Sequence, residues 1–218
     1  MQKQNQQRKI RTVVMLSGSG STLQNFIDRM ESGDLPIEIV RVISSKRDVY
    51  GLERARKHGI PAIAIARRDY PSWEEFNQAI TAAVDESSPD LILLAGYMSL
   101  FRPGAKYDGK IMNVHPALIP AFCGKGLYGH HVHQAVIEAG VRFTGATVHF
   151  VDQDYDTGPI ILQKVVPVLS DDTPDSLAER VQAAEREIYP EAVKLFAQNR
   201  LRIEGKCVRI LPRSEETT

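Results

Sequence analysis

An asparagine and a histidine two residues apart, Asn113 and His115, stand at the end of an apolar stretch that is typical of a β-strand. Alternate residues of an extended strand project from the same side, so the amide and the imidazole are predicted to face one site. An amide N–H can stabilise a developing oxyanion, and an imidazole can accept or donate a proton. The pair therefore indicates acyl-transfer chemistry. The competing interpretation is a polar pair that only satisfies backbone groups at a strand end.

A third candidate, Asp156, lies in an acidic loop further along the chain. An aspartate near His115 would favour the imidazolium form and raise the pKa of the imidazole above its ordinary value of about 6.5. Asp152 and Asp154 in the same loop are expected to be solvated turn residues. The loop lacks the spacing and the terminal Glu of an EF-hand calcium site, so no metal is predicted there.

A Gly/Ser loop, residues 18–22, follows the first predicted strand and precedes apolar residues at helical spacing. Backbone N–H groups and the helix dipole at such a turn can receive a phosphate. A dinucleotide fingerprint needs a third glycine, and Leu23 occupies that position, so a phosphate monoester fits better than NAD. A tight turn that merely uses Gly and Ser is the competing structural interpretation.

Histidines and cysteines give no metal-ligand pattern. Of His130, His131 and His133, only the first and last share a helix face, and no Cys or carboxylate joins them at a plausible spacing. They are expected at a helix start and a pocket wall. Cys123 and Cys207 are expected to be free thiols of a cytosolic protein.

The elements that must position these residues alternate between strands and helices. Strands are predicted at residues 11–16, 37–43, 61–66, 91–95 and 110–114, with helices at 49–58 and 72–86 and another after residue 22. Residues 91–95 are apolar at every position, as in a parallel strand buried on both faces. The first half is therefore predicted to be an α/β, Rossmann-like open sheet, mostly parallel and twisted, with helices on both faces.

The second half is predicted to change pattern. Residues 116–129 are rich in Gly and Pro and are expected to form a long functional loop. A helix at 130–139 leads to two strands, 145–151 and 159–168, whose short connection favours an antiparallel pair. A long helix is expected from Thr173 or Asp172 as N-cap to about residue 198, followed by strands around Leu201 and Val208.

Composition limits the possible partners. The 218 residues are 43% hydrophobic and 25% charged, and 27 Lys and Arg balance 27 Asp and Glu, so bulk attraction to nucleic acid or anionic membrane is not expected. The first ten residues are polar and basic, so no signal peptide is expected, and no apolar stretch reaches the ~18 residues that a membrane span needs. We expect a cytoplasmic protein with small-molecule partners, a monomer or homodimer. One domain is predicted at 11–211, with a flexible arm at 1–10 and a polar tail at 212–218.

Six segments occur in an order that is specific, although each alone is a weak signal. They are LSGSGSTLQ, VISSKRDVYGLERA, LLAGYMSLF, IMNVHPALIPAF, GATVHFVDQDYDTGPIILQ and RVQAAEREIYP. Together they resemble the phosphoribosylglycinamide formyltransferase (glycinamide ribonucleotide transformylase) family of the folate-dependent formyltransferase superfamily. The resemblance covers residues 13–209.

This resemblance implies transfer of a formyl group from the co-substrate 10-formyltetrahydrofolate to the amino group of glycinamide ribonucleotide in purine biosynthesis, without a metal. It matches Asn113, His115 and Asp156 to the catalytic trio, with protonated His115 and Asn113 stabilising the oxyanion. The ribonucleotide contacts it implies are Gly20, Ser21, Thr22, Gln182 and Glu185. The folate contacts it implies are Met98, Ser99, Leu100, Phe101, Asn113, Asp152, Gln153, Asp154, Tyr155 and Asp156.

Three alternatives stay open at this stage. A formyltetrahydrofolate deformylase would carry an extra N-terminal domain, and a methionyl-tRNA formyltransferase would carry a C-terminal one. A non-catalytic phosphosugar-binding sensor could use the same fold, although it would not need the whole trio. Many relatives carry Arg at the positions of Trp73 and Ser99, and Lys125 is expected to supply the missing positive charge for the folate tail.

Overall fold

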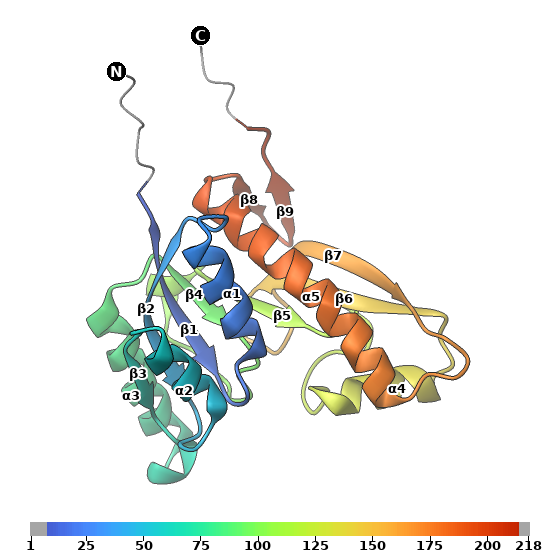
Figure 1. Cartoon of the computed structure of the whole chain (residues 1–218), viewed down its shortest axis with the longest axis horizontal. Coiled ribbons are helices and arrows are strands. Elements are labelled where there is room, and N and C mark those ends of the chain that lie inside the picture. The colour runs from blue at the N-terminus through green and yellow to red at the C-terminus, as the bar shows by residue number, and fades with distance from the viewer. Residues whose placement is uncertain (1–7, 214–218) are drawn as a thin grey trace.

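The structure is a computed structural model that describes residues 8–213, so most of the predicted N-terminal arm (1–7) and of the tail (214–218) lie outside the described residues. One nine-stranded sheet forms its centre, in the order β3-β2-β1-β4-β5-β6-β7-β9-β8 (Figure 1). The strands are β1 (Ile10–Leu16), β2 (Ile37–Ser44), β3 (Ala62–Ala64), β4 (Leu91–Leu94), β5 (Ile111–His115), β6 (Phe143–Phe150), β7 (Ile160–Pro167), β8 (Leu201–Glu204) and β9 (Cys207–Ile210).

Strand directions divide the sheet into two parts. Strands β1 to β5 pair in parallel, whereas β5 with β6 and β6 with β7 pair antiparallel. The predicted class, a mostly parallel open α/β sheet with an antiparallel C-terminal part, is confirmed. Because β1 has β2 on one side and β4 on the other, the strand order reverses there. Open sheets of this kind bind ligands beyond the carboxyl ends of the strands at that reversal.

Helices cover both faces of the sheet. They are α1 (Ser21–Glu31), α2 (Tyr50–Lys57), α3 (Trp73–Ser87), α4 (His130–Glu138) and α5 (Pro174–Ala197), with short 3-10 helices η1 (Arg67–Asp69) and η2 (Ala105–Tyr107). The apolar side chains of α1 and α5 pack into the larger core, and those of α3 into a second core on the other face (Figure 1). In α1, for example, the buried residues are Leu23, Phe26 and Ile27, the spacing of one helix face.

The long helix α5 is fixed at its start and in its middle. Thr173 is the N-cap and accepts a hydrogen bond from the Ser176 N–H, and Pro174 occupies the first turn, as the sequence predicts. Further along, the hydroxyl of buried Tyr189 lies 3.2 Å from the Leu94 carbonyl oxygen and 2.8 Å from that of Met112. These contacts tie α5 to β4 and β5, next to the strand ends that carry the candidate site.

Some predicted boundaries differ from the structure. Strand β5 begins and ends one residue later than the predicted 110–114, and β3 keeps three residues of the predicted 61–66. The short 3-10 helices η1 and η2 are not predicted at all, since a single turn leaves no periodic signal. In the part of the chain that the structure describes, no helix is long and apolar enough to cross a membrane.

Candidate active site

The end of β5 carries the first two members of the site. Asn113 is half-buried and His115 is buried, with 4% of its surface exposed. The loop that follows β5 folds back, so that the carbonyl oxygen of Phe122 lies 2.8 Å from His115 Nε2. A carbonyl oxygen only accepts hydrogen bonds, so Nε2 carries a proton and Nδ1 is the nitrogen left to face the site.

The carboxylate of Asp156 lies on that side of His115. Its Oδ2 is 3.6 Å from His115 Nδ1, and it accepts a hydrogen bond of 3.0 Å from the Gly124 N–H. Asp156 has a positive φ of 57°, a left-handed conformation that a residue other than glycine seldom adopts. Such backbone conformations gather at functional sites, where the surrounding structure holds them. The structure thus brings the three predicted catalytic residues together.

A second histidine, His149, belongs to the same cluster and is missing from the sequence predictions. It is buried on β6, directly across the antiparallel pair from Asn113. Its Nε2 lies 3.2 Å from Asn113 Nδ2 and 3.6 Å from Asp156 Oδ1. Its Nδ1 lies 2.8 Å from the Phe150 carbonyl oxygen. Pairing the predicted strand 145–151 against β5 would have found this residue, because alternate positions of β6 face the site.

Burial lowers the pKa of His115 below its ordinary value of 6.5. The charge of Asp156 and the hydrogen bond to the Phe122 carbonyl oppose that change but do not reverse it. The prediction that Asp156 raises this pKa above its ordinary value is therefore wrong. The sequence argument counted the charge of the neighbour but not the loss of water around a side chain that is almost wholly enclosed.

Asp156 itself is held in the ionised form. Burial opposes its ionisation, but the nearby imidazoles of His149 and His115 and the hydrogen bond from the Gly124 N–H outweigh that effect, so its pKa lies below the ordinary 3.8. The cluster therefore combines an anionic carboxylate, a proton-accepting imidazole and an amide donor. This is a set of groups that can move one proton and stabilise one oxyanion.

The predicted phosphate loop opens α1. Gly20 is buried at the N-cap with φ 73°, Ser21 is exposed and Thr22 is half-buried. A Cβ at Gly20 would lie 2.7 Å from the Gly51 Cα, so the loop packs on α2 at a distance that only glycine allows. The backbone N–H groups of this loop lie at the N-terminus of α1, where binding of an anion is favourable.

Serine hydroxyl groups join this loop to neighbouring strand ends. The Oγ atoms of Ser17 and Ser45 lie 2.6 Å apart, and the Met98 N–H donates to Ser17 Oγ at 2.9 Å. The segments after β1, β2 and β4 are therefore bound together at the carboxyl edge. Met98 and Ser99, predicted to contact folate, lie at this junction.

The two predicted folate segments meet at a small cavity of about 20 Å³. Its lining includes buried Phe101, the apolar residues Ile111 and Val151, and Asp152 with Gln153. Of the other residues predicted to contact folate, Leu100, which precedes Phe101, is half-buried, and Tyr155 is exposed.

The loop after β6 takes the turn geometry that its acids predict. The Thr157 hydroxyl donates to Asp152 Oδ1 at 2.7 Å, and the Asp154 N–H donates to the same oxygen at 3.2 Å. The Asp154 carboxylate lies 3.4 Å from the guanidinium of Arg102. These contacts fix the loop that ends in Asp156.

The predicted ribonucleotide contacts on α5 lie one turn apart. Gln182 is exposed and Glu185 is half-buried. Glu185 lies one helical turn before Tyr189, whose hydroxyl contacts the Met112 carbonyl oxygen of β5. Burial raises the pKa of Glu185 to about 7, and the charge of Arg186 opposes this only weakly. Glu185 can therefore gain or lose a proton near neutral pH, as a group that contacts a polar ligand often does.

The helix histidines do not form a metal site. His130 is exposed and lies 3.3 Å from Asp175, whereas His133 is buried and its pKa falls to about 4, mainly because of burial. Burial also raises the pKa of the Cys123 thiol, which disfavours a nucleophilic thiolate. Among residues 8–213, no group of three His, Cys, Asp or Glu side chains is arranged to hold a metal ion.

An open α/β sheet that presents an amide, an imidazole and a carboxylate at its carboxyl edge is the arrangement of an α/β enzyme suited to acyl transfer. Residues 10–193 match the model of the family described as formyl transferase. The chain belongs to the formyl transferase family.

Relatives of the chain carry related names. It is 39% identical over 207 residues to phosphoribosylglycinamide formyltransferase from Haemophilus influenzae, covering 92% of this chain and 95% of that protein. It is also 42% identical over 200 residues to trifunctional purine biosynthetic protein adenosine-3 from Bos taurus. That match covers 91% of this chain but only 19% of the much longer relative. The crystal structure of glycinamide ribonucleotide transformylase 1 from Symbiobacterium toebii is 44% identical, with a TM-score of 0.88 over 94% of this chain and 95% of that one.

Proposed function

We propose that this enzyme transfers the formyl group of 10-formyltetrahydrofolate to the amino group of glycinamide ribonucleotide, giving formylglycinamide ribonucleotide and tetrahydrofolate in purine biosynthesis. One observation carries the proposal: Asn113 and His115 on β5 and Asp156 in the loop after β6 converge in one cluster around His149. The names of the relatives that cover most of the chain support the same reaction.

In the proposed mechanism, the substrate amine attacks the formyl carbon and a tetrahedral oxyanion forms. The Asn113 amide donates a hydrogen bond to that oxyanion. Neutral His115 accepts the proton of the attacking nitrogen at Nδ1, and the imidazolium that results is stabilised by Asp156. The proton then passes to the leaving nitrogen of the donor as its bond to the formyl carbon breaks. This replaces the expectation that His115 is already protonated, because its pKa lies below the ordinary value.

Substrate binding is assigned to the surrounding segments. Gly20, Ser21 and Thr22 hold the phosphate at the N-terminus of α1, and Gln182 with Glu185 contact the ribose and glycinamide part. The pterin is assigned to residues 98–101 and 152–156, two segments that meet around Phe101 and Asp152, and no metal ion takes part in the reaction. The proposal includes a cytoplasmic location, small-molecule partners only, and a monomer or homodimer.

The test is product identification after the purified protein is mixed with 10-formyltetrahydrofolate and glycinamide ribonucleotide. The proposal predicts formylglycinamide ribonucleotide, formed only when both substrates are present. Free formate that forms without ribonucleotide would show a deformylase, in which water replaces the amine. Binding of both ligands without any turnover would show a non-catalytic sensor.

A further inference from the structure

A row of polar side chains crosses three neighbouring strands beside the candidate active site. His115 on β5 lies directly across from Thr147 on β6, and Thr147 lies directly across from Gln163 on β7. Residues directly opposite each other in an antiparallel pair project from the same face of the sheet. The His115 imidazole, the Thr147 hydroxyl and the Gln163 amide are therefore neighbours on one face.

This row holds the loop that follows β5. The Thr147 hydroxyl donates to the Ala117 carbonyl oxygen at 2.7 Å and accepts a hydrogen bond from the Ile119 N–H at 3.1 Å. Nε2 of Gln163 donates to the Ile119 carbonyl oxygen and to the Thr147 hydroxyl, each at 3.0 Å. Thr147 is 0% exposed, and its one donor and two lone pairs are all engaged. Both backbone groups of Ile119 are thus hydrogen-bonded to side chains of the sheet.

A tight turn carries this restraint to the catalytic histidine. The Ala121 N–H donates to the Leu118 carbonyl oxygen at 3.0 Å, and the residue after Ala121 is Phe122. The carbonyl oxygen of Phe122 lies 2.8 Å from His115 Nε2. Phe122 has a positive φ of 52°, a left-handed conformation that is unfavourable for a bulky residue and persists where neighbouring contacts hold it. The anchored turn therefore places the Phe122 carbonyl against the imidazole.

We propose that Gln163 and Thr147 are positioning residues for His115: by anchoring the loop, they keep the proton on Nε2 and leave Nδ1 free to accept the proton of the attacking amine. The inference rests on the proposed function and adds to it two residues outside the assigned substrate contacts. A neutral imidazole has two tautomers, and the hydrogen bond that one nitrogen makes decides which nitrogen carries the proton. Only the tautomer with a lone pair at Nδ1 can act as the base beside Asp156.

The competing role for this network is stability alone, because buried polar groups are hydrogen-bonded in most proteins. A network with that role would lower the free energy of unfolding when broken, but would leave the His115 tautomer and kcat of the folded enzyme unchanged. A positioning network changes where the proton lies in the folded protein. The tautomer is therefore the property to measure.

The experiment determines the tautomer of His115 by NMR of protein that carries ¹⁵N-labelled histidine, together with kcat and KM, in wild type and in Gln163→Leu. Leucine is similar in size to glutamine but donates no hydrogen bond, and Gln163 is exposed, so the variant should fold. Wild type should show a ring protonated at Nε2. One hydrogen bond is worth roughly 2–10-fold in an equilibrium, so Gln163→Leu should show a mixture of tautomers and a kcat roughly 3–30-fold lower. KM for the ribonucleotide should stay within about twofold of wild type, because its phosphate is assigned to residues 18–22.

Variants of Thr147 separate positioning from packing. Thr147→Ser keeps the hydroxyl and should keep the wild-type tautomer and kcat, whereas Thr147→Val removes the hydroxyl and should behave as Gln163→Leu. Thr147→Val combined with Gln163→Leu should lower kcat little more than either alone, because both residues act through one loop. Val165→Ala, on the same face of β7 at a position that is 59% exposed, should match wild type.

Three results would overturn the inference: a ring protonated only at Nε2 in Gln163→Leu, an unchanged kcat in that variant, or a loss in Thr147→Ser as large as that in Thr147→Val. The NMR measurement needs no turnover, so it separates this inference from the proposed function. A tautomer that changes in Gln163→Leu, in a protein that forms no formylglycinamide ribonucleotide, would support the positioning role and reject the reaction.

Discussion

Nδ2 of Asn113 lies 3.2 Å from Nε2 of His149, across the antiparallel pair of β5 and β6. His149 donates from Nδ1 to the Phe150 carbonyl oxygen, and an amide nitrogen can only donate, so Nε2 of His149 is the acceptor for Asn113. One N–H of the amide is then held by the imidazole, and the other is left for the oxygen of the reacting formyl group. His149 is therefore a positioning residue for Asn113.

This arrangement predicts strong coupling between the two side chains. His149→Ala should lower kcat about tenfold or more, because the amide loses its fixed orientation. The same substitution in an Asn113→Ala background should have little further effect, since the group that it positions is already absent. Rates for the two single variants and the double variant test this, and independent, multiplicative losses would reject the positioning role.

The pH dependence should follow the lowered pKa of His115. Neutral His115 is the proton acceptor, so kcat/KM should fall as the pH drops through this pKa, which lies below 6.5. Asp156 opposes the lowering, so Asp156→Asn should move the acidic limb of the profile to still lower pH as well as reduce the maximal rate. A limb that stays in place, or moves to higher pH, would contradict the proposed interaction.

Buried His133 should make the protein less stable in mild acid. Its pKa is about 4 in the folded state against 6.5 as its ordinary value, and its Nδ1 has no hydrogen-bond partner among the described residues. Between these values the unfolded chain binds the extra proton, so stability falls as the pH decreases from 6.5 toward 4. The expected loss between pH 7.5 and 4.5 is roughly 2–3 kcal/mol.

Urea unfolding at those two pH values measures this effect. His133→Leu should be less sensitive to the change by about that amount, while His131→Gln, which alters an exposed histidine of the same helix, should behave as wild type. Equal acid sensitivity in His133→Leu and wild type would show that His133 does not titrate in this range.

Gly51 should be required for the phosphate loop. An added Cβ would lie 2.7 Å from Cδ2 of the fully buried Leu16 and 3.0 Å from the Gly18 carbonyl oxygen, so Gly51→Ala must shift the Leu16 side chain and press on the loop. We expect a loss of stability of about 1–3 kcal/mol and a clear rise in KM for the ribonucleotide. Gly18→Ala adds the same methyl group where no atom lies within 4 Å, and its stability should match wild type. Equal stability of the two variants would contradict the packing argument.

Much of the fold could be predicted because its signals are local. The apolar run at 91–95, the Pro174 helix start and the short connection before β7 each follow from chain stereochemistry at neighbouring residues. The place of β4 beside β1, and of β9 beside β7, depends on contacts between distant segments that no local pattern records.

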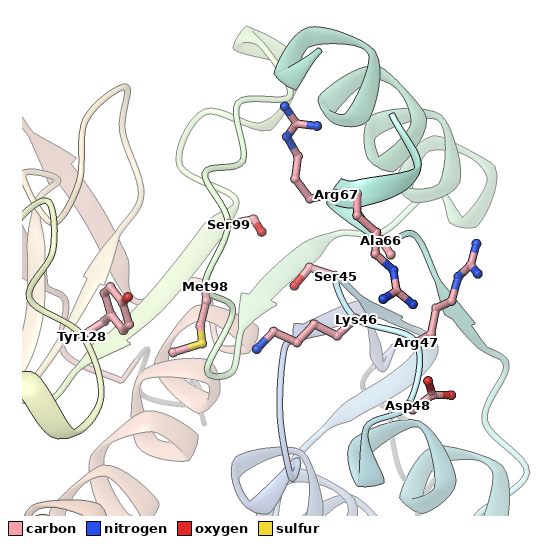
Figure 2. Close-up of a pocket in the computed structure, with 10 residues that line it drawn as sticks. Ser45, Lys46, Arg47, Asp48, Ala66, Arg67, Met98, Ser99 and Tyr128 are labelled. Carbon is pink, nitrogen blue, oxygen red and sulfur yellow. The ribbon is translucent and has the colours of Figure 1, made fainter. Parts of the chain in front are cut away.

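The candidate site shows the same division. The spacing of Asn113 and His115 on one strand predicts their common orientation, whereas the pKa of His115 depends on how completely other segments enclose it. His149 enters the site only through strand pairing. Arg67 and Arg68 lie in a single 3-10 turn and line a cavity of about 580 Å³ with Ser45 and Met98 (Figure 2), a position that could be found only from the folded chain.

The most direct test of the account is a single-turnover measurement with a donor labelled at the formyl carbon, comparing wild type with Asn113→Ala. Wild type should pass the label to the amine of glycinamide ribonucleotide. Asn113→Ala should do so about 10²–10³-fold more slowly, because one oxyanion donor is lost, while the affinity for the ribonucleotide stays close to that of wild type. Label that reaches the ribonucleotide at a near wild-type rate in Asn113→Ala, or that wild type releases as formate, would contradict the account.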